Sequence, residues 1–251
     1  NELINTSPTL SPIQKSFFIR RTQGVNHYNQ SVLLSLKKVI PEELVKKFIK
    51  IIINHHSNLQ SVFNKFDDEW HQRVIQNKDD SYFELIHLSN PNNLTDYCIN
   101  IQSSFDLSKG ALFKAVLFKC PDEYKLFLVA HHLIIDGISW RIIFEDLSIL
   151  YQQNLEKKKL ELPLKTHSFL YWQKKILKYS KSSKLKKEQN YWEKIENSYY
   201  DDLQKDLSNE TSFMKDTSYL TFNLNPQVSN KLLTECYNTF KTEINDLLIT
   251  C

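Results

Sequence analysis

The segment spanning residues 129–141 constrains the fold of this chain more than any other stretch. An apolar run leads into His131 and His132, and Asp136 and Gly137 follow four residues later. Helical spacing of apolar residues begins directly after Gly137, so the segment predicts a buried strand, a turn and a helix. Because neighbouring side chains of a strand point to opposite faces, only one of the two histidines can face a given side. The other must pack into the body of the protein.

This arrangement suits proton transfer. Histidine is the side chain that exchanges a proton near neutral pH, and the sheet would hold its ring while the strand end opens to a cleft. Asp136 can fold back onto the loop or cap the helix that follows it. The segment can therefore hold a proton-transfer residue rigidly. Packing of both rings, with one backbone hydrogen bond, is the structural alternative.

Other chemistries have weaker support. The chain has only three glycines, so no Gly-rich phosphate-binding loop can be written. A Ser-His-Asp hydrolase would need a nucleophile elbow, which is missing. A zinc site would need further ligands such as His55, His56 or His71, and their spacing fixes none of them beside His132. We expect no metal and no directly bound cofactor. The four cysteines lack CxxC spacing and are expected to be free thiols.

Hydrophobic periodicity along the chain alternates between strand and helix patterns, which predicts an α/β domain with helices layered on a central sheet. A polar segment over 197–216 is predicted as a linker or an exposed crossover. The predicted strands are 27–36, 59–66, 69–75, 82–88, 111–119, 124–131 and 219–224. The predicted helices are 41–55, 94–105, 138–153, 166–179, 184–196, 226–237 and 242–249.

Charge and hydropathy narrow the possible partners. The formal net charge of +3 is too small to indicate nucleic-acid binding. No apolar run approaches the roughly 20 residues of a membrane span. The first 16 residues show no signal peptide, so we expect a cytoplasmic protein that binds neither nucleic acid nor membrane.

The segment HHLIIDG resembles the HHxxxDG signature of condensation-type domains in nonribosomal peptide synthetases. Further stretches resemble other motifs of this family: residues 10–18, 26–34, 55–63, 162–172 and 242–248. The resemblance implies a chloramphenicol acetyltransferase-like layered sheet with flanking helices. Residues 1–225 would form the N-terminal subdomain, which carries HHxxxDG, and 226–251 the truncated start of the C-terminal subdomain.

Ser139 and Trp140, directly after the Asp-Gly pair, resemble the epimerization branch of the family. That branch converts a carrier-bound L-aminoacyl or peptidyl thioester to the D form by moving the Cα proton. The resemblance implies that His132 is the acid–base residue in the channel, while His131 packs and Asp136 orients the loop. Those three are the candidate catalytic residues, and Gly137, Ser139 and Trp140 complete the motif.

The same resemblance implies the partners. The substrate would be carried on the phosphopantetheine arm of a peptidyl carrier protein, next to adjacent synthetase domains. The missing C-terminal half would supply a glutamate opposite His132, so the chain alone should be inactive. Gln60 departs from the family, where an arginine commonly pairs with the motif aspartate. Either another arginine serves Asp136 (Arg20, Arg21, Arg73 or Arg141), or the loop is held less firmly.

Three alternatives stay open. A condensation domain would use His132 to assist an attacking amine and form a peptide bond. A non-catalytic condensation-like module would only recruit a partner. A small acyltransferase of the chloramphenicol type would assemble its site between chains.

Overall fold

The computed structural model describes residues 10–75, 80–121, 123–198 and 217–250. They belong to two compact units, Asn1–Glu196 and Asn197–Cys251. Each unit is considered by itself. The subdomain boundary between residues 225 and 226 rests on the family resemblance and stays a prediction.

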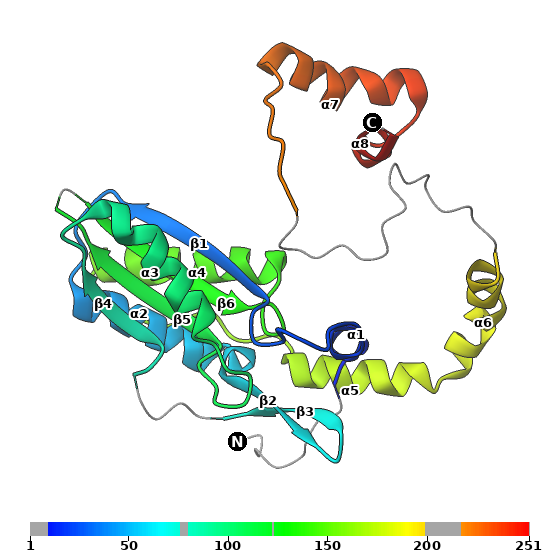
Figure 1. Cartoon of the computed structure of the whole chain (residues 1–251), viewed down its shortest axis with the longest axis horizontal. Helices are drawn as coiled ribbons and strands as arrows, with labels where there is room; N and C mark the ends of the chain where they lie inside the picture. Colours follow the sequence, from blue (N-terminus) through cyan, green and yellow to red (C-terminus); the bar gives the residue numbers. More distant parts are fainter. Residues whose placement is uncertain (1–9, 76–79, 122, 199–216, 251) are drawn as a thin grey trace. The chain divides into compact units, whose positions relative to one another are not determined.

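The first unit is built on a four-stranded mixed sheet in the order β1–β6–β5–β4 (Figure 1). The strands are β1 (Asn29–Leu36), β4 (Phe83–His87), β5 (Phe113–Lys119) and β6 (Tyr124–His131). β6 runs antiparallel to both neighbours, and with β5 it forms a hairpin of the two strands predicted over 111–119 and 124–131. β4 and β5 are parallel, and α3 (Leu94–Ser103) connects them, as a parallel pair requires a crossover.

Helices cover both faces of this sheet (Figure 1). Phe113 and Phe118 of β5 are an odd number of positions apart, so they point to opposite faces. Trp140 of α4 (Gly137–Leu155) lies 6.4 Å from Phe113, measured between ring centroids. Tyr97 of α3 lies 6.3 Å from Phe118. The fold is therefore the layered α/β arrangement that was predicted.

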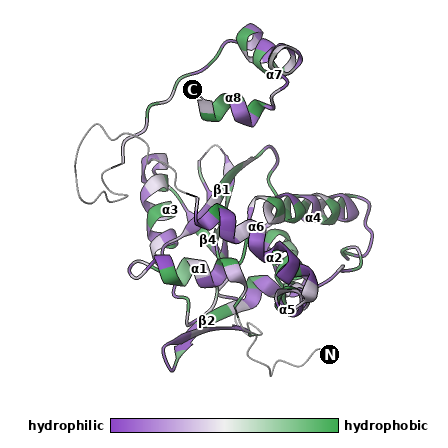
Figure 2. Cartoon of the chain, turned by 90° about the vertical axis from the view of Figure 1, so that its right-hand side faces the viewer, coloured by the Kyte–Doolittle hydropathy of each residue, from purple (hydrophilic) through white to green (hydrophobic). Residues whose placement is uncertain are grey.

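The core forms where the apolar side of a helix meets the sheet. α2 (Glu42–His55) buries one side chain on almost every turn and packs beside α4. Figure 2 shows hydrophobic and hydrophilic residues alternating around α4, as expected of a helix with one covered and one exposed side. Ile49, Phe63, Leu117 and Leu128 are among the fully buried residues of the shared core.

A second sheet consists of the hairpin β2 (Ser61–Phe66) and β3 (Glu69–Val74). Asp67 and Asp68 join its strands with φ angles of 46° and 62°. Positive φ at both turn residues matches the twist of the flanking strands, and aspartate tolerates this conformation. The remaining elements are η1 (Ser57–Gln60), η2 (Pro91–Asn93), α5 (Phe169–Ser180), α6 (Ser183–Glu196), and, in the second unit, α7 (Pro226–Phe240) and α8 (Ile244–Thr250).

Two predictions differ from the structure. Helix α1 (Pro12–Arg20) was not predicted, although Ser11 and Gln14 form a capping box and Pro12 is the first helical residue. The strand predicted over 219–224 is wrong. Tyr219 and Leu220 are 83% and 92% exposed, and no strand partner forms there among the described residues of the second unit. Most of the predicted linker, residues 199–216, lies outside the described residues.

Cys98, Cys120 and Cys236 are free thiols, while Cys251 lies outside the described residues. Within the ranges that the structure describes, no helix combines the length and apolar character that a membrane crossing would require.

A buried network of side-chain amides ties three elements together. Gln14 of α1, Gln72 of β3 and Gln173 of α5 are each at most 2% exposed. The Gln173 amide donates to the oxygens of Gln14 and Gln72 at 2.8 and 3.1 Å. The Gln72 amide donates in turn to Asn58 and Ser61 at 2.9 and 2.8 Å. Gln72 is therefore the centre of the network.

The network also reaches the loop after β6. The Asn58 amide donates to the carbonyl oxygen of Ile134 at 2.9 Å, and the Gln14 amide lies 3.4 Å from that of Leu133. Side chains from α1 and from the segment between α2 and β2 thus hold the loop that follows the histidine pair.

Replacement of Gln72 by leucine should destabilise the first unit. The substitution keeps the side-chain volume but removes one hydrogen bond from each of several buried amide and hydroxyl groups, at about 0.5–1.5 kcal/mol for each bond lost. Urea unfolding followed by circular dichroism measures the loss. Gln23→Leu, at an exposed position before β1, is the matched control. Equal stability of the two variants would contradict a structural role for the network.

Candidate active site

At the end of β6 the side chains of the two adjacent histidines point in different directions. The backbone N–H of His131 donates to the Leu112 carbonyl at 2.8 Å, and that of His132 donates to the Tyr28 carbonyl at 2.7 Å. His131 is fully buried. The ring of His132 borders a pocket. The two rings therefore diverge, as strand alternation predicts.

His131 has all its ring hydrogen bonds inside the protein. Its Nε2 lies 2.9 Å from the Val25 carbonyl oxygen, so this nitrogen carries the proton. Its Nδ1 accepts the backbone N–H of Leu133 at 3.2 Å. Burial lowers the pKa of His131 to about 4, because the charged ring would be desolvated. His131 is thus a neutral packing residue in this structure.

The His132 ring is held on three sides. Its Nδ1 lies 2.7 Å from the carbonyl oxygen of Ile135, within the same loop. Its Nε2 lies 3.1 Å from the side-chain nitrogen of Gln30 in β1. Tyr28 stacks on the ring with centroids 5.1 Å apart. The ring therefore has one defined orientation.

Gln30 and Trp140 support the His132 ring through consecutive hydrogen bonds. The indole N–H of Trp140 donates to the side-chain oxygen of Gln30 at 3.0 Å. Trp140 is 7% exposed and stacks on Phe144 of the same helix. Trp140 was expected only as part of the motif, and no role was predicted for Gln30. Gln30 lies within residues 26–34, which resemble a family motif, but its contact with His132, 102 positions away, could not be read from local spacing.

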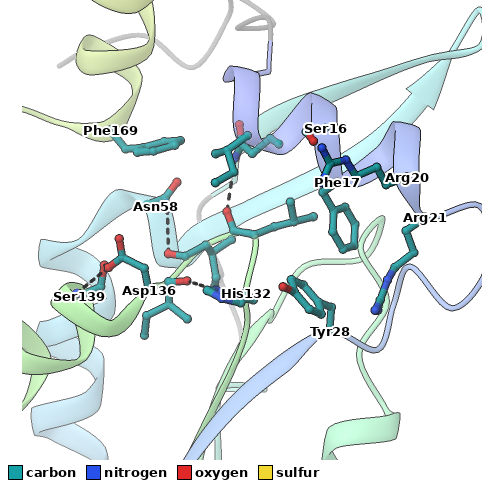
Figure 3. A pocket seen from close by; sticks show the side chains of 15 residues that line it. Ser16, Phe17, Arg20, Arg21, Tyr28, Asn58, His132, Asp136, Ser139 and Phe169 are labelled. Carbon is teal, nitrogen blue, oxygen red and sulfur yellow. Dashed lines mark hydrogen bonds between the residues drawn. The ribbon is translucent and has the colours of Figure 1, made fainter. Parts of the chain in front are cut away.

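The pocket has a volume of about 570 Å³. Figure 3 shows Arg20 of α1 and the following Arg21 on one side and Asp136 and Phe169 on the other, with His132 and Tyr28 between them. Arg21 rests over the Tyr28 ring at 4.6 Å and donates to the His27 carbonyl. The other lining residues are Ile13, Gln14, Ser16, Phe17, Asn58, Leu133, Ile134, Ile135 and Ser139.

Asp136 caps helix α4. One carboxylate oxygen accepts the backbone N–H of Ser139 at 2.8 Å and its hydroxyl at 2.6 Å. These bonds hold the pKa of the Asp136 carboxyl below its usual value. Gly137 begins the helix, and a Cβ added there would meet nothing within 4 Å, so neither close packing nor a positive φ explains this glycine.

The expected arginine partner of Asp136 is not seen. Among the ion pairs between described residues, no arginine contacts Asp136. Gln60 donates to the Ile53 carbonyl at 3.0 Å instead of reaching toward the loop. In this structure the described arginines thus leave Asp136 without an ion pair. Ser139 and the amides of Asn58 and Gln14 hold the loop in its place.

The metal and hydrolase alternatives have no geometric basis here. His55 and His56 pack against each other near Asp146, which lies 2.6 Å from His56 Nε2. His71 lies on β3. In the part of the chain that is described, no three His, Cys, Asp or Glu side chains form a group that could hold a metal ion. Ser139 donates to Asp136 and not to a histidine, so these residues form no Ser-His-Asp relay.

Sequence comparisons identify the family to which this chain belongs. The model of the family described as "Condensation domain" matches residues 4–251. The chain is 34% identical over 258 residues to bacitracin synthase 2 of Bacillus licheniformis, covering 100% of this chain and 10% of that protein. It is also 34% identical over 248 residues to tyrocidine synthase 2 of Brevibacillus parabrevis, covering 96% of this chain and 7% of that protein.

Solved structures give the same fold. The epimerization domain from the third module of tyrocidine synthetase B matches with a TM-score of 0.86 and 34% identity. The match covers 98% of this chain and 56% of that one. The starter condensation domain of rhizomide synthetase matches at 0.66 and 18% identity over 78% of this chain and 49% of that one, which supports the fold alone. The chain thus spans about half of such a domain.

Buried His131 should make the stability of the first unit depend on pH. Its folded pKa of about 4 lies below the unfolded value of 6.5, so only the unfolded chain takes up a proton between these values. The contribution of the neutral ring is fully present above about pH 6.5 and is lost as the pH falls towards 4. The loss amounts to about 3 kcal/mol. Urea titrations at pH 7 and 4.5 measure it.

The variant His131→Gln should flatten this slope, because glutamine cannot be protonated. His87→Gln, at an exposed histidine of β4, serves as the control and should keep the wild-type slope. A steep slope retained in His131→Gln would assign the effect to another group.

The cap at Asp136 gives a second expectation. Asp136→Ala should cost about 0.5–2 kcal/mol, because the first turn of α4 loses its acceptor. Asp136→Asn should cost less, since asparagine accepts the same hydrogen bonds. With its folded pKa depressed, the aspartate stabilises the fold above about pH 4 and loses this effect as the pH falls through its folded pKa. Thermal unfolding of the three proteins at pH 7 and pH 3 compares them, and equal values for the two variants would exclude a capping role.

Proposed function

Because this chain belongs to the condensation-domain family of nonribosomal peptide synthetases, we propose that it is part of an epimerization domain. The domain would convert a carrier-bound L-aminoacyl or peptidyl thioester to its D form. The observation that carries the proposal is the His132 ring, which is fixed by hydrogen bonds and borders a pocket of about 570 Å³.

Proton removal on one face of the substrate fits a positioned histidine. The Cα proton next to a thioester carbonyl is weakly acidic, since the carbanion formed is stabilised as an enolate. A positioned imidazole can take this proton at neutral pH. Return of a proton from the opposite face, by the glutamate expected across the channel, inverts the centre. His132 is the proton-transfer residue in this proposal, His131 is a packing residue, and Asp136 is a positioning residue.

Two observations favour epimerization over peptide-bond formation. Ser139 and Trp140, which resemble the epimerization branch, both take part in the site: Ser139 bonds the capping Asp136, and Trp140 bonds Gln30 behind His132. In addition, the structure with 34% identity and a TM-score of 0.86 is an epimerization domain. The condensation domain of rhizomide synthetase, at 18% identity, carries no such argument.

The substrate would arrive on the phosphopantetheine arm of a peptidyl carrier protein, and no cofactor need bind to the chain itself. Residues 1–225 would form one wall of the substrate channel, and 226–251 would begin the subdomain that forms the other. The chain spans 56% of the solved epimerization domain. We therefore expect the opposing glutamate to come from outside this chain, and the chain alone to be inactive. The proposed location is the cytoplasm, alongside the other synthetase domains.

The test uses the longest native protein that contains this chain. Its carrier domain is loaded with an L-aminoacyl thioester in D₂O, and deuterium at Cα and the D/L ratio are followed by mass spectrometry and chiral chromatography. We expect deuterium entry with accumulation of the D form. His132→Ala should slow exchange by about 10²–10⁴-fold, which is the usual contribution of a positioned acid–base group.

The control is His87→Ala, which changes an exposed histidine of β4 and should exchange at the wild-type rate. Amide formation without Cα exchange, once an acceptor carrier is supplied, would replace epimerization by condensation. Wild-type behaviour of His132→Ala in both assays would indicate a non-catalytic module.

A further inference from the structure

A chain of hydrogen bonds runs from the buried face of α4 to the basic edge of His132. Trp140 bonds Gln30, Gln30 bonds His132 Nε2, and His132 Nδ1 bonds the Ile135 carbonyl. We propose that Gln30, oriented by Trp140, is a positioning residue that donates to Nε2 of His132 and keeps this nitrogen an unprotonated acceptor, while the Ile135 carbonyl holds the ring proton on Nδ1. The use of the Nε2 lone pair at Cα rests on the proposed function, but the position of the proton does not.

The first step is the orientation of the Gln30 amide. An indole N–H is a donor and never an acceptor, so the atom of Gln30 that faces Trp140 at 3.0 Å must be the carbonyl oxygen. The NH₂ group of Gln30 then points the other way. The two ends of the amide, which are easily confused by shape, are distinguished here by their partner.

The second step is the state of His132. The NH₂ group of Gln30 lies 3.1 Å from Nε2, and a donor there requires a lone pair on the ring nitrogen. At the other edge, the Ile135 carbonyl can only accept, so Nδ1 at 2.7 Å must donate. Each end of the ring independently demands the same tautomer.

The third step is rigidity. In the register of the sheet, Gln30 lies opposite Ala130, and Ala130 lies opposite Phe113. These three residues share the face that Trp140 covers, since the Trp140 ring packs 6.4 Å from that of Phe113. Gln30 is therefore fixed by strand pairing at its backbone and by α4 at its side chain.

The consequence is that the surroundings of the ring disfavour a proton on Nε2. A proton on Nε2 would face the NH₂ group of Gln30, and turning that amide would set its NH₂ group against the indole N–H. The other titratable or charged groups around the ring are Tyr28, Arg21, His131 and the capped Asp136. None of them contacts Nε2 in this structure, so Gln30 decides what that nitrogen meets before substrate arrives.

The experiment reads the proton positions directly. Long-range ¹H–¹⁵N correlation spectra of the 251-residue chain, labelled with ¹⁵N-histidine, are recorded at neutral pH, and His132→Ala identifies the signals of His132. The wild type should show a protonated Nδ1 and an unprotonated, hydrogen-bonded Nε2. Gln30→Glu should protonate both nitrogens at the same pH, because a carboxylate accepts from the Trp140 indole and from Nε2–H at once.

Two further variants separate this effect from a general loss of structure. Gln30→Leu and Trp140→Phe should both keep the Nδ1 proton and move the Nε2 resonance downfield, towards that of an unbonded ring nitrogen. Gln23→Glu makes the same change of charge at an exposed position and should leave the His132 signals unchanged. The signals of the other histidines and the far-UV circular dichroism report whether each variant is folded.

The proposal is overturned if wild-type His132 carries its proton on Nε2. It also fails if folded Gln30→Glu keeps a single ring proton, or if Gln23→Glu changes the His132 signals equally. These spectra need no carrier protein. If the spectra behave as expected while the native protein shows no exchange at Cα, the proposed function fails and the proton assignment stands.

Discussion

The pairing of β6 between β1 and β5 is the constraint on which the site depends. Two backbone hydrogen bonds at the end of this strand, to Leu112 on one side and Tyr28 on the other, fix the chain at the histidine pair. Since the side chains of a strand alternate, fixing this backbone buries the ring of His131 and turns that of His132 to the pocket. Every later contact of His132, with Gln30, Tyr28 and Ile135, follows from that backbone position.

Uncharged amides and a helix cap hold the loop that follows β6. Gln60 bonds a carbonyl of α2, and the loop is held by Asn58, by Gln14 and by the cap at Asp136. Amides carry no full charge, so they lose less on burial than charged groups would. Buried amides still cost stability wherever one of their polar atoms lacks a hydrogen-bond partner. In this chain Gln72 supplies a partner to both Asn58 and Gln14, and Gln173 supplies another to Gln14.

The spacing of apolar residues predicted most helices and strands, because these elements form from residues close together in sequence. The strand, turn and helix around residues 129–141 were predicted from apolar spacing, and so were the strands on either side of the Asp67-Asp68 turn. Helix α1 was missed although its capping box was legible. The strand over 219–224 failed because alternation of apolar residues marks a strand only where a neighbour completes its hydrogen bonds. The positions of Gln30, Gln72 and Gln173 could not be predicted, since tertiary contact alone brings these distant residues to the loop.

The pairing of β1 with β6 also has a kinetic consequence. Gln30 of β1 and His132, directly after β6, are 102 positions apart in sequence, so their contact closes a long loop. Loop closure over such a distance is slow compared with the formation of the β5–β6 hairpin, which is local. At synthesis rates of about 5–20 residues per second, β1 waits for several seconds on the ribosome before its partner strand emerges. During that interval β1 is an unpaired strand edge, the kind of surface on which chaperones act and aggregation begins.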